Sequence, residues 1–307
     1  MIIYYFRTVK DDALKQIDSL RNGVWIHAEA PTETELTNLV ESLDLDQSML
    51  EDAKDFFEVP RLERSNGITY FFTRYPYNEQ TEDTDTAPLL IVVGETFVLT
   101  ITQRDVPQLQ VLFEGKEIVH TTQKTKLFIR IMQAITVSYE KQLVRLRKAV
   151  QKDRLHLRKI GNQEIVRFVN YEHKLNDIIA AVLPTNFALQ QVLAGSYMQI
   201  YKDDRELVED LRVDNTQVVE SARSLLKTIQ NVRSATEAIL TNSLNNRIKT
   251  LTVLTILLTI PTIVSSLYGM NVPLPLQDQP LAFAFVLMVV VFVMAIGAWY
   301  FKKRDWF

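Results

Sequence analysis

The sequence predicts an α+β cytoplasmic domain followed by a long stalk helix and two C-terminal transmembrane helices. Two observations support this fold class. Residues 250–270 and 281–301 each run for 21 positions without a charge, and a helix of that length spans roughly 31 Å, about one hydrocarbon thickness. Residues 196–260 contain neither glycine nor proline, which favours one continuous helix that enters the first apolar stretch.

The first 120 residues predict an α/β domain with a mixed sheet and flanking helices. Residues 31–35 open a helix with an acid-rich first turn, and Gly94-Glu95 joins two apolar runs as a tight hairpin. The acidic stretch 78–86 is interpreted as a solvated loop between strands, in preference to a cation site. Five runs rich in β-branched and aromatic residues predict strands, at 2–7, 23–28, 68–75, 89–93 and 96–102.

Residues 121–249 are assigned to long helices, which include the stalk. Apolar residues with a 4-3-4-3 spacing, typical of coiled coils, predict a stripe packed against neighbouring helices. A single break near Asn245-Asn246 is the alternative to one helix that continues into the first span. The stripe comprises Val218, Ala222, Leu225, Ile229, Val232 and Ile239, with Thr236 at the missing step.

The flanking charges predict the orientation. Basic residues precede the first span (250–270) and follow the second (281–301), whereas the loop 271–280 contains neither Lys nor Arg. By the positive-inside rule the loop lies outside and both termini are cytoplasmic, with 302–307 as a basic cytoplasmic tail. The expected location of the protein is the cell inner (plasma) membrane. The basic residues are Arg247, Lys249, Lys302, Lys303 and Arg304.

The composition excludes several classes of function. Basic and acidic residues number 34 and 37, so nucleic acid is not an expected partner. The chain has no cysteine, which excludes disulfides, thiolate metal sites and cysteine nucleophiles. No Walker-type loop and no histidine pair at metal-ligand spacing is present. The sequence therefore predicts neither an enzyme nor a nucleotide-driven pump.

The first span carries hydroxyl residues spaced 3-4-3-4, which place them on one helix face, whereas the second span is aliphatic and aromatic. Five hydroxyl residues on one face favour a polar pore lining over the alternative, a small-residue face that packs against another helix. Two spans cannot enclose a water-filled path, so a pore requires a homo-oligomer. The face comprises Thr252, Thr255, Thr259, Thr262 and Ser266, and Ile248 and Asn245 extend it.

The end of the first span predicts an ion entrance. Gly269 permits a turn with positive φ, after which Asn271 offers a neutral amide oxygen just outside the membrane. A ring of such oxygens suits hydrated Mg²⁺, which sheds water reluctantly, whereas carboxylates would release the ion slowly. Within the span, Pro261 removes the amide that would bond the carbonyl of Leu257, and marks either a kink or a carbonyl that faces polar neighbours.

These segments resemble the CorA family of magnesium transporters. The resemblance rests on Tyr268-Gly269-Met270-Asn271 between two spans, on the approach NNRIKTLTVLTILLTIPT and on the terminal KKRDWF, with weaker likeness at LEDA (50–53) and PRLE (60–63). It implies a pentameric funnel in which the first spans form an inner ring. It also implies that Ile248 and Leu251 form a hydrophobic constriction, which can close by dewetting.

The resemblance implies roles for individual residues. Gly269, Met270 and Asn271 would form the selectivity entrance. Thr259 stands where better-known relatives have a bulky apolar residue, and Pro261 stands one position later than in some relatives, so the number of constrictions and the kink are left open. The implied pore lining comprises Asn245, Ile248, Leu251, Thr255, Thr259, Thr262 and Ser266.

The resemblance also implies regulation by cytoplasmic Mg²⁺ between neighbouring subunits. Asp52 and Asp210 match the acids that hold it, although both are also ordinary solvated helix acids. Mg²⁺ would thus be transported and regulatory, and Co²⁺ or Ni²⁺ could also pass. Inward movement of a divalent ion gains about 4.6 kcal/mol per 100 mV from the membrane potential. The alternatives are a Zn²⁺ transporter of the related ZntB type and, less favoured, a membrane-anchored signalling protein.

Overall fold

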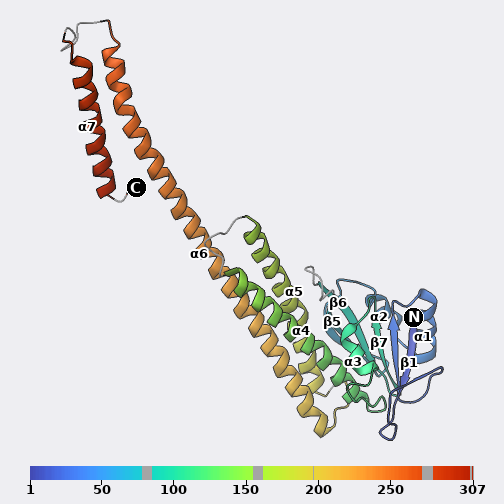
Figure 1. Cartoon of the computed structure of the whole chain (residues 1–307). Coiled ribbons are helices and arrows are strands. Elements are labelled where there is room, and N and C mark those ends of the chain that lie inside the picture. The colour runs from blue at the N-terminus through green and yellow to red at the C-terminus, as the bar shows by residue number, and fades with distance from the viewer. Residues whose placement is uncertain (78–84, 155–161, 196, 272–278, 305, 307) are drawn as a thin grey trace. The chain divides into compact units, whose positions relative to one another are not determined.

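The computed structural model describes the chain except residues 78–84, 155–161, 196, 272–278, 305 and 307 (Figure 1). The chain divides into two compact units, Met1–Asn231 and Val232–Phe307. The acidic stretch interpreted as a solvated loop lies largely outside the described residues. Its last two residues, Asp85 and Thr86, begin strand β6.

The first unit is built on a seven-stranded sheet in the order β2-β1-β3-β7-β6-β5-β4. β3 and β7 pair in parallel, whereas the neighbouring pairs are antiparallel, which confirms the predicted mixed sheet. The strands are β1 Ile2–Phe6, β2 Lys15–Ile17, β3 Val24–Glu29, β4 Arg61–Ser65, β5 Ile68–Tyr77, β6 Asp85–Val93 and β7 Phe97–Thr102.

Five of these strands confirm the sequence prediction, and β6 and β7 form the predicted hairpin across Gly94-Glu95. The prediction missed β2 and β4, the two edge strands. Lys15 and Gln16 of β2 are exposed, and β4 has only one apolar residue, Leu62. Edge strands expose one side to water, so they lack the apolar run by which buried strands are found.

Helices cover both faces of the sheet. α1 (Glu33–Leu43) and α2 (Gln47–Asp52) pack on the face that carries Ile26, Phe72 and Leu99. Thr32 caps α1 with a capping box, as its acidic first turn predicts. On the other face Phe71 meets Phe128 of α4 (Lys124–Arg154), with ring centroids 5.0 Å apart. Two short helices, η1 (Pro107–Leu109) and α3 (Gln110–Phe113), lead toward α4.

Three long helices lie side by side in the first unit (Figure 1). Thr136 of α4 bonds Asn215 of α6 (3.0 Å). Asn186 of α5 (Asn162–Leu193) bonds Thr216 of α6 (2.9 Å). α6 runs from Lys202 to Tyr268 without interruption, so the alternative of a break near Asn245-Asn246 is wrong. The predicted stripe is buried from Val218 to Val232 and at Thr236, whereas Ile239 is exposed.

The second unit contains the C-terminal part of α6 and α7 (Ala282–Lys303). Both helices are long and apolar enough to cross a membrane, and their apolar segments are almost entirely unburied within the chain. A soluble core helix would be covered by its own domain. The exposed apolar surface therefore supports the predicted pair of spans.

Candidate ion pathway

The threonines of the first span are exposed, and their hydroxyl protons bond to backbone carbonyls of the same helix. Each hydroxyl donates to the carbonyl four residues back, at 2.8 Å for Thr252, 2.9 Å for Thr255, 2.8 Å for Thr259 and 2.9 Å for Thr262. A hydroxyl has one proton and two lone pairs. With the proton committed to the backbone, the face presents a row of hydrogen-bond acceptors. Such oxygens suit the water shell of a cation.

α7 packs on the opposite face of α6. Val253 lies two residues before Thr255 and Leu257 two residues after it, so each is about 200° from Thr255 around the helix, in opposite directions. Val253 is fully buried, and a Cβ added to Gly297 of α7 would lie 3.1 Å from Leu257 Cδ2. Ser266, like the threonines, is exposed. The hydroxyl face is therefore the face of α6 that α7 leaves open.

Apolar side chains flank the hydroxyl face on both sides. Leu254 and Leu258 lie on one flank and are 50% and 55% exposed. Ile256 and Ile263 lie on the other and are 42% and 53% exposed. In a bilayer such flanks can contact lipid or the same helix of another copy. One α6 supplies only one wall, and a closed path needs several.

An apolar band precedes the threonines on the same face. Ile248 and Leu251 lie within about 40° of Thr255 around the helix and are 52% and 64% exposed. Asn245 is also exposed and lies at the edge of the face, about 80° from Thr255. The structure therefore brings the predicted pore residues onto one accessible surface of a single helix.

The end of the first span differs from the prediction at Gly269. Its backbone does not adopt a positive φ, because its amide continues the helix by donating to the carbonyl of Ser265 at 2.9 Å. The helix also continues past Pro261, which lies inside α6. Met270 and Asn271 are exposed beyond the last turn. The glycine thus ends the helix without the expected left-handed turn.

The first predicted regulatory acid, Asp52, lies in a charged cluster at the end of α2. Arg61 Nη2 donates to Asp52 Oδ2 at 2.6 Å, and the same guanidinium pairs with Glu58 and Glu63. It also lies 4.0 Å from the ring centroid of Phe72. Three carboxylates around one guanidinium leave a local excess of two negative charges, which attracts cations.

The second predicted regulatory acid, Asp210, is exposed on α6. Its neighbour Glu209 is bound to Arg212 at 2.6 Å, and this hydrogen bond holds the pKa of Glu209 below its usual value. Among the described residues no group of three or more acidic or histidine side chains is placed to hold a metal ion. The site between Asp52 of one copy and Asp210 of the next stays a prediction.

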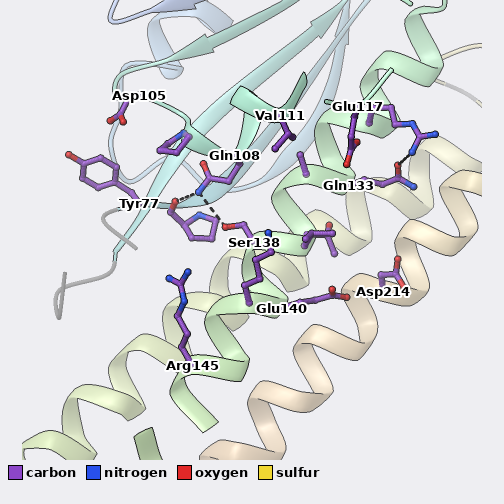
Figure 2. A pocket seen from close by; sticks show the side chains of 17 residues that line it. Tyr77, Asp105, Gln108, Val111, Glu117, Gln133, Ser138, Glu140, Arg145 and Asp214 are labelled. Carbon is purple, nitrogen blue, oxygen red and sulfur yellow. Dashed lines mark hydrogen bonds between the residues drawn. The ribbon is translucent and has the colours of Figure 1, made fainter. Parts of the chain in front are cut away.

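A cavity of about 790 Å³ lies in the first unit among η1, α4, α6 and the end of β5 (Figure 2). Gln108 Nε2 donates to the carbonyl of Pro76 at 2.7 Å and lies 3.4 Å from Ser138 Oγ. Burial, together with the charge of Asp214, raises the pKa of Glu140. Sequence reasoning missed this cavity because its lining comes from distant segments. Its mixed charges indicate no particular ligand.

A family model and a known protein each match most of this chain in sequence. The sequence model of a family described as CorA-like Mg2+ transporter protein matches residues 21–303. The cobalt/magnesium transport protein CorA of Methanocaldococcus jannaschii is 26% identical over 290 residues, which cover 92% of this chain and 91% of that protein.

Two solved structures share the fold. The complete structure of the CorA magnesium transporter from Methanocaldococcus jannaschii matches with a TM-score of 0.89 and 21% identity, over 100% of this chain and 99% of that one. The ZntB cytoplasmic domain of Vibrio parahaemolyticus matches with a TM-score of 0.63 and 10% identity, over 78% of this chain and 98% of that one.

Proposed function

Because this chain belongs to the CorA family of Mg²⁺ transporters, we propose that it forms a homo-oligomeric membrane channel for hydrated Mg²⁺. The observation that carries the proposal is the open face of α6. Its threonine protons are bound to the backbone, so lone pairs face outward. A hydrated cation directs water protons at its surroundings, and a row of acceptors can receive them. Co²⁺ and Ni²⁺ are further proposed substrates.

The arrangement of copies follows from the two sides of α6. α7 lies behind α6 against Leu257, so it can face lipid while the hydroxyl face turns inward. The apolar flanks then meet the α6 helices of neighbouring copies. A pentamer in the cell inner membrane, with both termini cytoplasmic, is the assembly we propose. The number of copies and the compartment rest on the family resemblance and the flanking charges.

The proposed pathway has three zones. Gly269, Met270 and Asn271 form the entrance, where amide oxygens receive the hydrated ion. Thr255, Thr259, Thr262 and Ser266 line the middle. Ile248 and Leu251 form an apolar constriction that closes when water leaves it, and Asn245 follows on the cytoplasmic side.

Regulation by cytoplasmic Mg²⁺ is proposed at the subunit interface, between Asp52 of one copy and Asp210 of the next. The cluster around Arg61 supports Asp52 as a cation-attracting residue, since its negative charge exceeds its positive charge. A bound divalent ion would hold adjacent copies together in the closed state. The membrane potential, worth about 4.6 kcal/mol per 100 mV for a divalent ion, then drives influx.

Mg²⁺ influx into proteoliposomes tests this function. The purified protein is reconstituted with a Mg²⁺-sensitive dye inside and an inward-negative potential. We expect influx in the parent and a large loss in Asn271→Ala, because the entrance oxygens are removed. Asn246→Ala is the matched control, since Asn246 is exposed on the side of α6 opposite the hydroxyl face and should leave influx unchanged.

The other outcomes distinguish the alternatives. Zn²⁺ flux without Mg²⁺ flux would favour a transporter of the ZntB type, whose cytoplasmic domain shares this fold. Absence of any ion flux, even with internal Mg²⁺ chelated, would contradict the channel and leave a membrane-anchored signalling protein. Equal influx in the parent and Asn271→Ala would remove the proposed entrance.

A further inference from the structure

The outward side of α7 forms an exposed apolar column that ends in cations. Val290 is buried and Gly297 lies against Leu257, so these residues mark the side of α7 that packs on α6. Trp299 follows Gly297 by about 200° around the helix and is 62% exposed. The column comprises Phe285, Met288, Phe292, Ile296 and Trp299, each at least half exposed.

Two cations lie beside aromatic rings at the end of this column. Lys303 is one turn beyond Trp299, and its Nζ lies 5.3 Å from the indole centroid. Arg304 lies next to it, with Cζ 5.5 Å from the ring centroid of Tyr300. These contacts hold both positive groups at the end of the apolar segment, where the aromatic belt of a span meets the phosphate layer.

The end of α7 carries exposed positive charge. Lys302, Lys303 and Arg304 carry three positive charges and are exposed. Asp305 lies outside the described residues, and it is the one acidic side chain in 302–307, so basic side chains exceed acidic ones by two in this segment. Among the residues that the structure describes, no carboxylate forms an ion pair with any of the three cations. Anions near this surface are therefore attracted and meet no described competitor.

We propose that Trp299, Lys303 and Arg304 bind the phosphate of an anionic phospholipid in the cytoplasmic leaflet. The ammonium and guanidinium groups receive the headgroup, the indole lies at the interface, and the acyl chains follow Phe292 and Ile296. A lipid fits this surface better than free phosphate does, because only a lipid also covers the exposed column below the cations. The inference rests on the membrane topology of the proposed function.

The expected preference is moderate. A cation close to an anionic membrane surface strengthens attraction by about fivefold. Lys303 and Arg304 together would favour an anionic over a zwitterionic lipid by at most about 30-fold, and by less where salt screens the charges.

Quenching of Trp299 fluorescence by brominated lipids tests the site in the full-length protein. The background is Trp306→Phe, which leaves Trp299 as the responsive indole because Trp25 is 0% exposed. Vesicles contain equal small fractions of brominated phosphatidylglycerol or brominated phosphatidylcholine in Mg²⁺-free buffer. We expect brominated phosphatidylglycerol to quench Trp299 more strongly than brominated phosphatidylcholine does. Adding Lys303→Gln and Arg304→Gln should abolish this preference.

Lys148→Gln with Lys227→Gln in the same background is the charge-matched control, because both lysines are exposed in the first unit and lie outside both apolar segments. It should retain the preference. Equal quenching by the two lipids, or a preference that survives Lys303→Gln with Arg304→Gln, would overturn the site. Competition by inorganic phosphate alone would overturn it as a lipid site.

Mg²⁺ influx in the same vesicles separates this inference from the proposed function. Influx without a lipid preference would refute the lipid site alone. Absence of quenching by either lipid would contradict membrane insertion of α7, on which both proposals depend.

Discussion

Acidification should destabilise the first unit through one buried histidine. His27 of β3 is 4% exposed, its Nδ1 lies 2.9 Å from Thr100 Oγ1, and its ring lies 5.0 Å from that of Phe113. Burial, with a smaller contribution from the N-terminal ammonium, lowers the pKa of His27 from 6.5 to about 4. The folded state therefore keeps this imidazole neutral where an unfolded chain would protonate it.

The sign and size of the effect follow from linkage. Between pH 6.5 and about 4 the unfolded state binds more protons at this position than the folded state does. The stabilising effect of neutral His27 is thus complete above pH 6.5 and is lost as the pH falls toward 4. At about 1.36 kcal/mol for each pH unit, the loss reaches at most about 3.4 kcal/mol.

Denaturant unfolding of the full-length protein in a background of Trp299→Phe with Trp306→Phe, followed by the fluorescence of Trp25, measures this loss. Trp25 is a local reporter because its Nε1 donates to the same Thr100 hydroxyl at 3.1 Å. His27→Gln should flatten the pH dependence between 6.5 and 4, whatever its effect on stability at pH 7. His120→Gln, at a half-buried histidine, should leave the slope in place. An unchanged slope in His27→Gln would refute the reasoning.

Three further predictions address the pathway and its control. Leu251→Asn should hydrate the proposed constriction, so that Mg²⁺ influx continues at internal Mg²⁺ concentrations that close the parent; equal closure would contradict the constriction. Asp52→Asn removes a ligand of the proposed sensor, and inhibition should need several-fold more internal Mg²⁺, with Asp55→Asn as the control. An unchanged inhibition curve would exclude Asp52 as a sensor. Glu140→Gln should raise the free energy of unfolding at pH 7, because burial and Asp214 disfavour the charged form of Glu140. This gain should vanish as the pH falls through the pKa of Glu140. A gain that persists at lower pH would contradict this explanation.

The membrane part of the fold could be predicted because its signals are local. An uncharged stretch and a threonine spacing are properties of consecutive residues, and a helix converts them directly into a span and a face. The long helix could be predicted for the same reason. The edge strands β2 and β4 could not, since Lys15 and Arg61 give them no buried pattern.

Only the part of the candidate site that lies on a single helix could be predicted from the sequence. The hydroxyl face of α6 needs no partner to be recognised, and the structure adds that the threonine protons bind the backbone. The environment of Asp52 depends on Arg61, nine residues away, which a helical pattern cannot show. At Gly269 the choice between a left-handed and a helical backbone depends on hydrogen bonding to Ser265, and composition does not reveal it.

The continuity of α6 limits how movement can reach the membrane. Between Lys202 and Tyr268 the helix contains no glycine, and its one backbone amide donor lost to proline is at Pro261, inside the apolar segment. The stretch before the membrane thus lacks a flexible joint. Within the second unit, a twist or tilt of α6 after Val232 therefore reaches Leu251 with no hinge to absorb it. A rotation of α6 by about 100°, which is one residue step, would bring Leu254 and Leu258 to the position of the threonine row. The polar surface there would become apolar.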